Sequence, residues 1–208
     1  MRRGHSPTAR GASAALLNAS LSALYALFIY RHAVVFRETG EPTFLAIIVL
    51  ETMIVAMFLL RREASASNVS MVALAATALG TFSTLFVAPI GRSDVPSIVT
   101  VTIQLIGLTM AIVALGSLRR SFGLAPANRG VKTSGLYRFV RHPLYASYLV
   151  ALSGYLLAYP APRNFALVAA SIVGQLIRMS LEERLLLRDQ QYVAYAARTR
   201  FRIVPGLY

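Results

Sequence analysis

The sequence predicts an all-α membrane protein, a polytopic helical bundle of about six transmembrane helices with a C-terminal amphipathic helical tail. The chain has 208 residues, of which 56% are hydrophobic and only 14% are charged, and its mean hydropathy is +0.60. A soluble domain of this length is less apolar. Several apolar stretches are long enough to cross a bilayer, and the basic residues between them fit one orientation.

The spanning helices are predicted from apolar segments of roughly 20 residues, the length that crosses the hydrocarbon at about 1.5 Å per residue. They cover residues 12–30, 42–60, 69–89, 95–117, 143–159 and 163–181. The fifth is the shortest. The first follows Arg2 and Arg3 as a signal peptide would, but it exceeds the usual length of a signal's apolar core and lacks a small-residue cleavage site. We therefore expect a retained span.

The basic residues predict that both termini face the cytoplasm. They cluster before the first segment, after the second, after the fourth and from Arg178 to the end of the chain. Of the 21 Lys and Arg residues, only four fall in the other set of loops: Arg31, Arg37, Arg92 and Arg163. Because positive charge concentrates in cytoplasmic loops, this orientation is favoured strongly over its reverse.

The composition also excludes several classes of protein. The net charge of +13 lies beside membrane helices and not in a soluble basic module, so anionic lipid head groups are expected as partners in place of nucleic acid. The chain has no cysteine and only three scattered histidines. Disulfides, thiolate chemistry and a metal site are therefore not expected.

The chain divides into two regions of different character. Residues 1–117 are predicted to form a scaffold of transmembrane helices that shapes a substrate entrance, and residues 118–208 to form the catalytic region. The second region begins with a basic loop with turns at Gly123, Gly130 and Gly135. Its last two apolar segments are joined by the short turn Tyr159–Arg163, which predicts an antiparallel hairpin. Such a hairpin places Arg141-His142 beside Glu182-Glu183.

Arg141, His142 and Pro143 mark the start of the fifth helix. Proline suits the first helical turn, and it pushes His142 before it toward extended geometry. Free backbone N–H groups, the helix dipole and the Arg141 guanidinium would together suit a carboxylate or phosphate of a ligand. The alternative is structural, with Arg141 as a topology anchor and His142 as a capping residue.

Glu182 and Glu183 lie about 100° apart around a helix, so we expect one to face a site and the other to support it. Glu182 follows Arg178 by four residues, and the alternative for it is an ordinary solvated ion pair. Five tyrosines are expected near the same membrane face, either as an interfacial belt or as ring faces for a nucleobase or a cation. They are Tyr137, Tyr145, Tyr148, Tyr192 and Tyr195, of which Tyr145 and Tyr192 are the stronger candidates.

Glu51 lies in the middle of the second apolar segment. An ionisable group at that depth is costly, which makes it a functional candidate. We expect it to be protonated or paired with a polar side chain such as Gln104. His5 and His32 are expected to be solvated.

Residues 121–208 resemble the isoprenylcysteine carboxyl methyltransferase family and its phospholipid methyltransferase relatives. The shared motifs are an Arg-His-Pro-x-Tyr element and a downstream Glu-Glu. The matching positions are Gly135-Leu-Tyr137, Arg141-His-Pro-Leu-Tyr145, Gly154, Arg178, Glu182-Glu183, Leu186, Tyr192, Tyr195, Arg202 and Pro205. Ser147 stands where the family usually has glycine.

The resemblance implies an integral membrane enzyme that transfers a methyl group from S-adenosylmethionine to a lipophilic carboxylate, amine or thiol at the cytoplasmic face. It implies Arg141 and Glu183 as catalytic residues near the accepting atom. The cofactor-binding residues that it implies are Tyr137, His142, Pro143, Leu144, Tyr145, Arg178, Glu182, Glu183 and Tyr192. No metal is required.

Two other functions compete with this prediction. Membrane sterol and steroid reductases, which use NADPH, share an Arg-His-Pro-x-Tyr element and a similar C-terminal tail, but Glu182-Glu183 follows the methyltransferase pattern. A small transporter or membrane scaffold would instead make Glu51 central and the basic tail a lipid anchor.

Overall fold

The computed structural model describes residues 7–60, 66–67, 70–118, 121, 127–128 and 130–206. The regular secondary structure in this part of the chain is helical, apart from one two-residue strand pair. The helices are α1 (Pro7–Thr39), α2 (Pro42–Leu60), α3 (Met71–Phe82), α4 (Ser97–Leu118), α5 (Pro143–Ala158), α6 (Pro162–Leu186) and α7 (Gln190–Arg198), with 3₁₀ turns η1 (Ser83–Phe86) and η3 (Gly135–Arg138). Strands β1 (Ala66–Ser67) and β2 (Ala127–Asn128) pair in antiparallel fashion. The predicted all-α class is confirmed.

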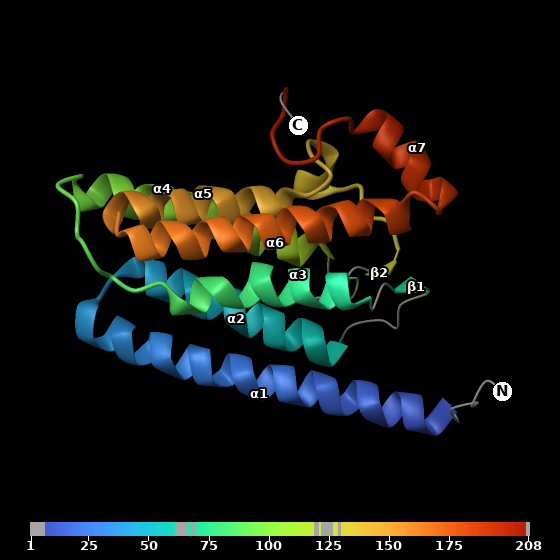
Figure 1. Ribbon diagram of the computed structural model, residues 1–208, viewed down its shortest axis with the longest axis horizontal. Coiled ribbons are helices and arrows are strands. Elements are labelled where there is room, and N and C mark those ends of the chain that lie inside the picture. Colours follow the sequence, from blue (N-terminus) through green and yellow to red (C-terminus); the bar gives the residue numbers. More distant parts are fainter. Residues whose placement is uncertain are drawn as a thin grey trace.

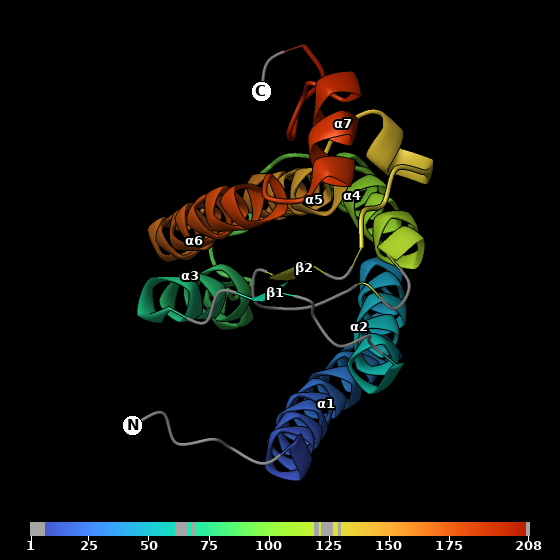
Figure 2. The same ribbon diagram turned by 90° about the vertical axis from the view of Figure 1, so that its right-hand side faces the viewer.

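The long helices form an arc around a common space (Figures 1 and 2). Neighbours along the arc are α1, α2, α4, α5, α6 and α3, in that order, so the chain order is broken by α3, which packs on α6. The closest pairings are α4 with α5, α1 with α2, and α3 with α6. α7 lies beyond the ends of α5 and α6, next to the C-terminal tail (Figure 1).

Four helices are long and apolar enough to cross a membrane: residues Asn18–Thr39 of α1, α2, α4 and α6. α5 and the stretch Met71–Phe86 are shorter apolar helices. The third predicted segment, 69–89, is therefore not one continuous helix. The chain leaves helical geometry at Val87, where Asn164 of α6 bonds both backbone groups of Ala88, accepting from its N–H at 3.2 Å and donating to its carbonyl at 2.9 Å.

The first helix runs further than the predicted segment 12–30. Arg31, His32 and Arg37 lie within α1 and not in a loop. α1 ends at Thr39 because Gly40 adopts a left-handed φ of 67°, and its N–H bonds to the Phe36 carbonyl. α6 likewise extends past the predicted 163–181, so that Glu182 and Glu183 lie in its final turns.

The α4–α5 contact depends on Gly107. A Cβ at this position would lie 2.3 Å from the backbone N of Ala151, so only glycine allows the two helices to approach this closely. At Gly116, by contrast, an added Cβ would make only an ordinary contact of 3.7 Å with Met53. This close pairing fixes α5, which carries part of the site.

The helix ends predicted to be cytoplasmic lie toward the same side of the arc, the side on which α1 begins and α6 ends (Figure 1). Several residues behind that prediction fall outside the described part of the chain, among them Arg2, Arg3, Arg61, Arg62, Arg119, Arg120 and Arg129. His5 and the turn at Gly123 also lie outside it. Within the described part, Gly130 and Gly135 have left-handed φ values of 97° and 63°, as expected of turn residues.

Candidate functional site

The site lies where α5 begins and α6 ends. Only three residues, Tyr159 to Ala161, separate the two helices, so the predicted antiparallel hairpin is confirmed, although α5 packs mainly on α4. The start of α5 is held by the C-terminal tail. The N–H of Arg141 donates to the Phe201 carbonyl at 2.9 Å, and the N–H of His142 donates to the Arg202 carbonyl at 2.8 Å. Ile203 of the tail is buried against Tyr145 and Met179.

Glu183 is the centre of a buried hydrogen-bond network. Its Oε2 accepts from Arg141 Nη1 at 2.5 Å. Its Oε1 accepts from His142 Nε2 at 2.8 Å and from the Tyr192 hydroxyl at 2.6 Å. The residue is 3% exposed. Because both oxygens are engaged by donors from α5 and α7, this carboxylate ties the three elements together.

Glu182 has a different environment from its neighbour. Its Oε2 accepts from the Tyr145 hydroxyl at 3.1 Å, and the residue is partly exposed. The Arg178 guanidinium lies one turn earlier on α6, 5.5 Å from the Tyr145 ring centroid, within the range of a cation–π contact. Glu182 is therefore more than the solvated partner of Arg178, since it belongs to a cluster with a buried tyrosine.

The tyrosines of the loop and of α7 are held as neutral hydroxyl donors. Burial raises the pKa of Tyr192, and its hydrogen bond to Glu183 raises this pKa further. Burial also raises the pKa of Tyr137, and it raises that of Tyr195 to about 12. The Tyr195 hydroxyl donates to the Tyr137 carbonyl at 2.5 Å, which fixes η3 against α7.

A cavity of about 570 Å³ extends from this cluster into the apolar interior of the arc. Its lining at the site end includes Tyr137, Arg141, His142, Leu144, Tyr145, Arg178, Glu182 and Tyr192. The other two predicted site residues, Pro143 and Glu183, are buried and do not line it. The structure thus separates the two glutamates: Glu182 borders the cavity, and Glu183 holds the residues that border it.

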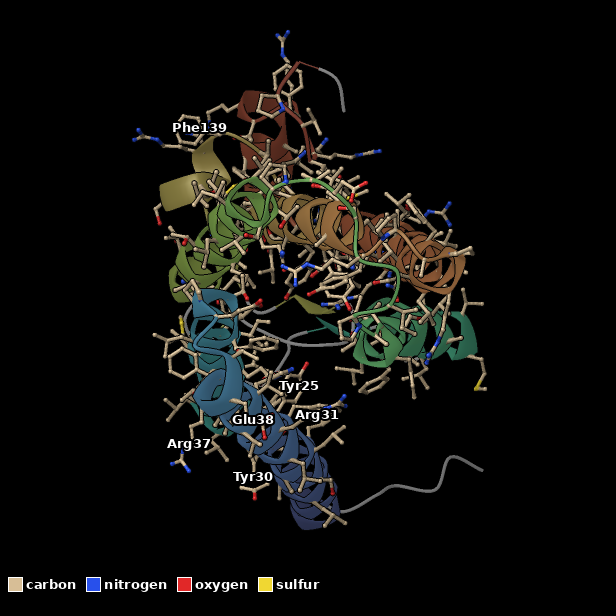
Figure 3. The ribbon with its side chains drawn as sticks, turned by 90° about the vertical axis from the view of Figure 1, so that its left-hand side faces the viewer. Tyr25, Tyr30, Arg31, Arg37, Glu38 and Phe139 are labelled. Atoms are coloured by element: carbon tan, nitrogen blue, oxygen red, sulfur yellow. The ribbon has the colours of Figure 1, made fainter. Side chains whose placement is uncertain are left out.

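The cavity also contacts the two ends of the arc, α1 and α3. Tyr25 and Arg31 of α1 line it, as do Gly80 and Thr81. Figure 3 shows Tyr25 and Arg31 on the side of α1 that faces the inside of the arc, whereas Tyr30 and Arg37 point away from it. The cavity therefore lies inside the arc of helices and extends well beyond the site itself.

The N-terminus of α5 offers fewer free backbone N–H donors than the sequence predicted. The N–H groups of Tyr145 and Ala146 both bond to the His142 carbonyl, and Pro143 has no N–H. A different donor is available. Arg141 Nε is buried and has no hydrogen-bond partner among the described residues, so an anionic ligand group is better served by this guanidinium than by the helix end.

Some features of the site were not found from the sequence. Nothing in the sequence indicates that the Tyr195 hydroxyl donates to the Tyr137 carbonyl. The same is true of the tail carbonyls that accept from Arg141 and His142. Tyr148, one of the five tyrosines expected at this face but not one of the two stronger candidates, lines the cavity one turn after Tyr145. Glu51 pairs with His32, whose Nδ1 lies 2.9 Å from Glu51 Oε2. The predicted Gln104 partner and the predicted solvation of His32 were both wrong, because His32 is helical.

The sequence comparison matches the model of the phospholipid methyltransferase family to residues 95–192. The match begins at the start of α4, before the predicted boundary at residue 118, and ends at Tyr192. It includes both sides of the site, from Arg141 to Glu183, and supports a membrane methyltransferase in general terms. No curated protein matches the chain.

Proposed function

Because the stretch of chain that builds this site belongs to the phospholipid methyltransferase family, we propose that the protein is an integral membrane methyltransferase that uses S-adenosylmethionine. It transfers the methyl group to a lipophilic acceptor through a carboxylate, amine or thiol. The active site is the end of the cavity bordered by α5, α6 and α7, on the side predicted to be cytoplasmic.

The observation that carries this proposal is the joining of a polar, charged cluster to an apolar cavity. Arg141, His142 and Tyr192 converge on the buried Glu183, while Tyr145 and Glu182 border the space beside them. A polar cofactor and a lipophilic acceptor need such a junction, because the cofactor reaches the site from water and the acceptor reaches it from the membrane.

The residues present fit the cofactor. Arg141 Nε, buried without a partner among the described residues, would donate a hydrogen bond to the cofactor carboxylate. Glu182 would balance its positive charge, and the rings of Tyr145 and Tyr192 offer faces to adenine or to the sulfonium. When bound, the cofactor supplies a methyl group on a positively charged sulfur. The protein's own part is to align donor and acceptor and to exclude water.

Glu183 is assigned a positioning role in this proposal. Its hydrogen bonds orient Arg141 and His142 at the cavity edge, and it does not itself border the space. The lipophilic acceptor reaches the site through the interior of the arc, because the lining of the cavity as a whole is mostly apolar.

The test is calorimetric titration of the detergent-purified protein with S-adenosylhomocysteine and, separately, with NADPH. Saturable binding of S-adenosylhomocysteine alone is expected. Saturable binding of NADPH without S-adenosylhomocysteine would overturn the proposal in favour of a membrane reductase.

A further inference from the structure

The cavity has further polar groups in its lining that do not belong to the cluster around Glu183. Glu51 and His32 both line the cavity, and Glu51 is 6% exposed. Glu51 occupies the central position of the 19-residue α2, so it lies near the middle of a membrane-spanning helix. Ionisable side chains at this depth are costly, and they are retained mainly where they meet a partner or a polar ligand.

The His32 contact satisfies only part of the Glu51 carboxylate. His32 Nδ1 lies 2.9 Å from Oε2, and the imidazole packs against Phe44 with ring centroids 6.0 Å apart. A carboxyl group has two oxygens and about four acceptor positions. Within the described part of the chain, the hydrogen bond from His32 uses one of them. Acceptor capacity therefore remains on a group that borders the cavity.

Gln175 adds a second acceptor to the same cavity. It lies close to the middle of α6 and is 7% exposed. Its Nε2 donates to Ser171 Oγ at 3.0 Å and to the Gly80 carbonyl at 3.5 Å. Its Oε1 is buried and has no hydrogen-bond partner among the described residues.

The orientation of the Gln175 amide follows from its neighbours. The Ser171 hydroxyl donates its only hydrogen to the Gly80 carbonyl, at 2.8 Å. Towards Gln175 this hydroxyl can therefore only accept a hydrogen bond. The Gly80 carbonyl can also only accept. The amide must therefore turn its NH₂ toward both, and its oxygen elsewhere. A buried amide oxygen without a donor costs stability, and a ligand that donates a hydrogen bond would remove that cost.

We infer that the unused acceptors of the His32–Glu51 pair and of Gln175, which line the same cavity, provide a second recognition point for a hydroxyl or amine N–H group of a lipophilic molecule. Both sites present unused acceptors, so the recognised group is a hydrogen-bond donor. The inference rests on the proposed function only in identifying this molecule with the methyl acceptor.

The spacing along α6 sets the size of such a molecule. Gln175 precedes Glu182 by seven residues, about 10 Å along the helix. A methyl acceptor that bonds to Gln175 and reaches the site beside Glu182 therefore carries its donor group about 10 Å from its other polar group, with an apolar segment between them. This is a substrate class with two separated polar groups on an apolar frame.

The test compares three probes of equal chain length in detergent by native mass spectrometry: hexadecanol, hexadecylamine and hexadecyl methyl ether. The wild-type protein is expected to retain the alcohol or the amine about tenfold more strongly than the ether, which is the size of one hydrogen bond. Preference for the amine identifies an ammonium ligand, and preference for the alcohol identifies a hydroxyl ligand.

Glu51→Gln and Gln175→Met are each expected to bring the ratio toward one. Thr52→Val is the matched control, because Thr52 follows Glu51 on α2 but is exposed and does not line the cavity. Gln175→Met keeps the test valid if Glu51→Gln does not fold. A wild-type ratio of one for both probes overturns the inference, as does a preference that folded variants leave unchanged.

Failure of this inference is distinguishable from failure of the proposed function. Probe retention needs neither cofactor nor methyl transfer. A protein that binds S-adenosylhomocysteine but shows no probe preference retains the proposed function and loses the second recognition point.

Discussion

At the scale of single residues, two adjacent glutamates have different tasks because the helix turns about 100° between them. Glu182 borders the cavity beside Tyr145. Glu183 is buried among Arg141, His142 and Tyr192. Substitution of each should therefore affect a different property.

Glu182→Gln is expected to weaken S-adenosylhomocysteine binding about tenfold, because it removes the charge that balances the cofactor. It should shift the melting temperature by only about 2 °C, since the side chain is partly exposed. Glu183→Gln should instead destabilise the protein by about 3 kcal/mol, because it leaves Arg141 without its buried carboxylate partner. Calorimetric titration and thermal unfolding in detergent measure the two effects. Equal loss of stability in both variants would contradict this division.

The raised pKa of Tyr195 predicts a dependence of stability on pH. Folding favours the neutral phenol, so its contribution is complete below the ordinary pKa of 10.0 and is lost as the pH rises toward the folded value of about 12. Tyr195→Phe should reduce the loss of stability over this range. Tyr30→Phe, an exposed position on α1, is the control. An unchanged profile in Tyr195→Phe would show that this hydroxyl does not titrate with unfolding.

At the scale of elements, the C-terminal tail positions the start of α5. Its backbone carbonyls accept from Arg141 and His142, and Ile203 anchors it against Tyr145 and Met179. The tail thus fixes residues on which the site depends, although none of its described residues lines the cavity.

Ile203→Ala is expected to destabilise the protein by about 2–5 kcal/mol, because a buried side chain leaves a cavity. Cofactor affinity should fall with it, as Arg141 and His142 lose their alignment. Val204→Ala, at a residue 41% exposed, should change neither property. Denaturation and titration of both variants test this, and equal effects would show that the tail does not act through Ile203.

The sequence predicts the convergence of Arg141, His142 and the glutamate pair because a short turn leaves the hairpin little freedom. It could not decide which glutamate faces the cavity, since that depends on the rotation of α6 against its neighbours. The sequence does not predict the His32–Glu51 pair because its first apolar segment ends at residue 30, whereas the helix continues to Thr39. The break after α3 depends on Asn164, a contact between residues distant in sequence.

At the scale of the whole molecule, the proposed active site lies at the helix ends that the basic residues of the sequence predict to be cytoplasmic. The chain has no cysteine, so single introduced thiols report on sidedness directly. Arg188→Cys lies after α6, near the site, and Asp94→Cys lies in the loop before α4 at the opposite end. Both positions are exposed.

A membrane-impermeant thiol reagent applied to intact cells should label Asp94→Cys and leave Arg188→Cys unlabelled, because positive charge favours the cytoplasmic side. Lysis of the cells should expose both. Labelling of Arg188→Cys in intact cells would reverse the proposed orientation of the active site.

The most direct measurement of the central claim is transfer of radiolabelled methyl from S-adenosylmethionine into a lipid extract by the purified protein. The account predicts label in the lipophilic fraction with the wild-type protein and with Thr52→Val, and strongly reduced label with Glu182→Gln. Equal incorporation by Glu182→Gln would contradict the assigned site. No incorporation by a wild-type protein that binds and oxidises NADPH would contradict the function itself.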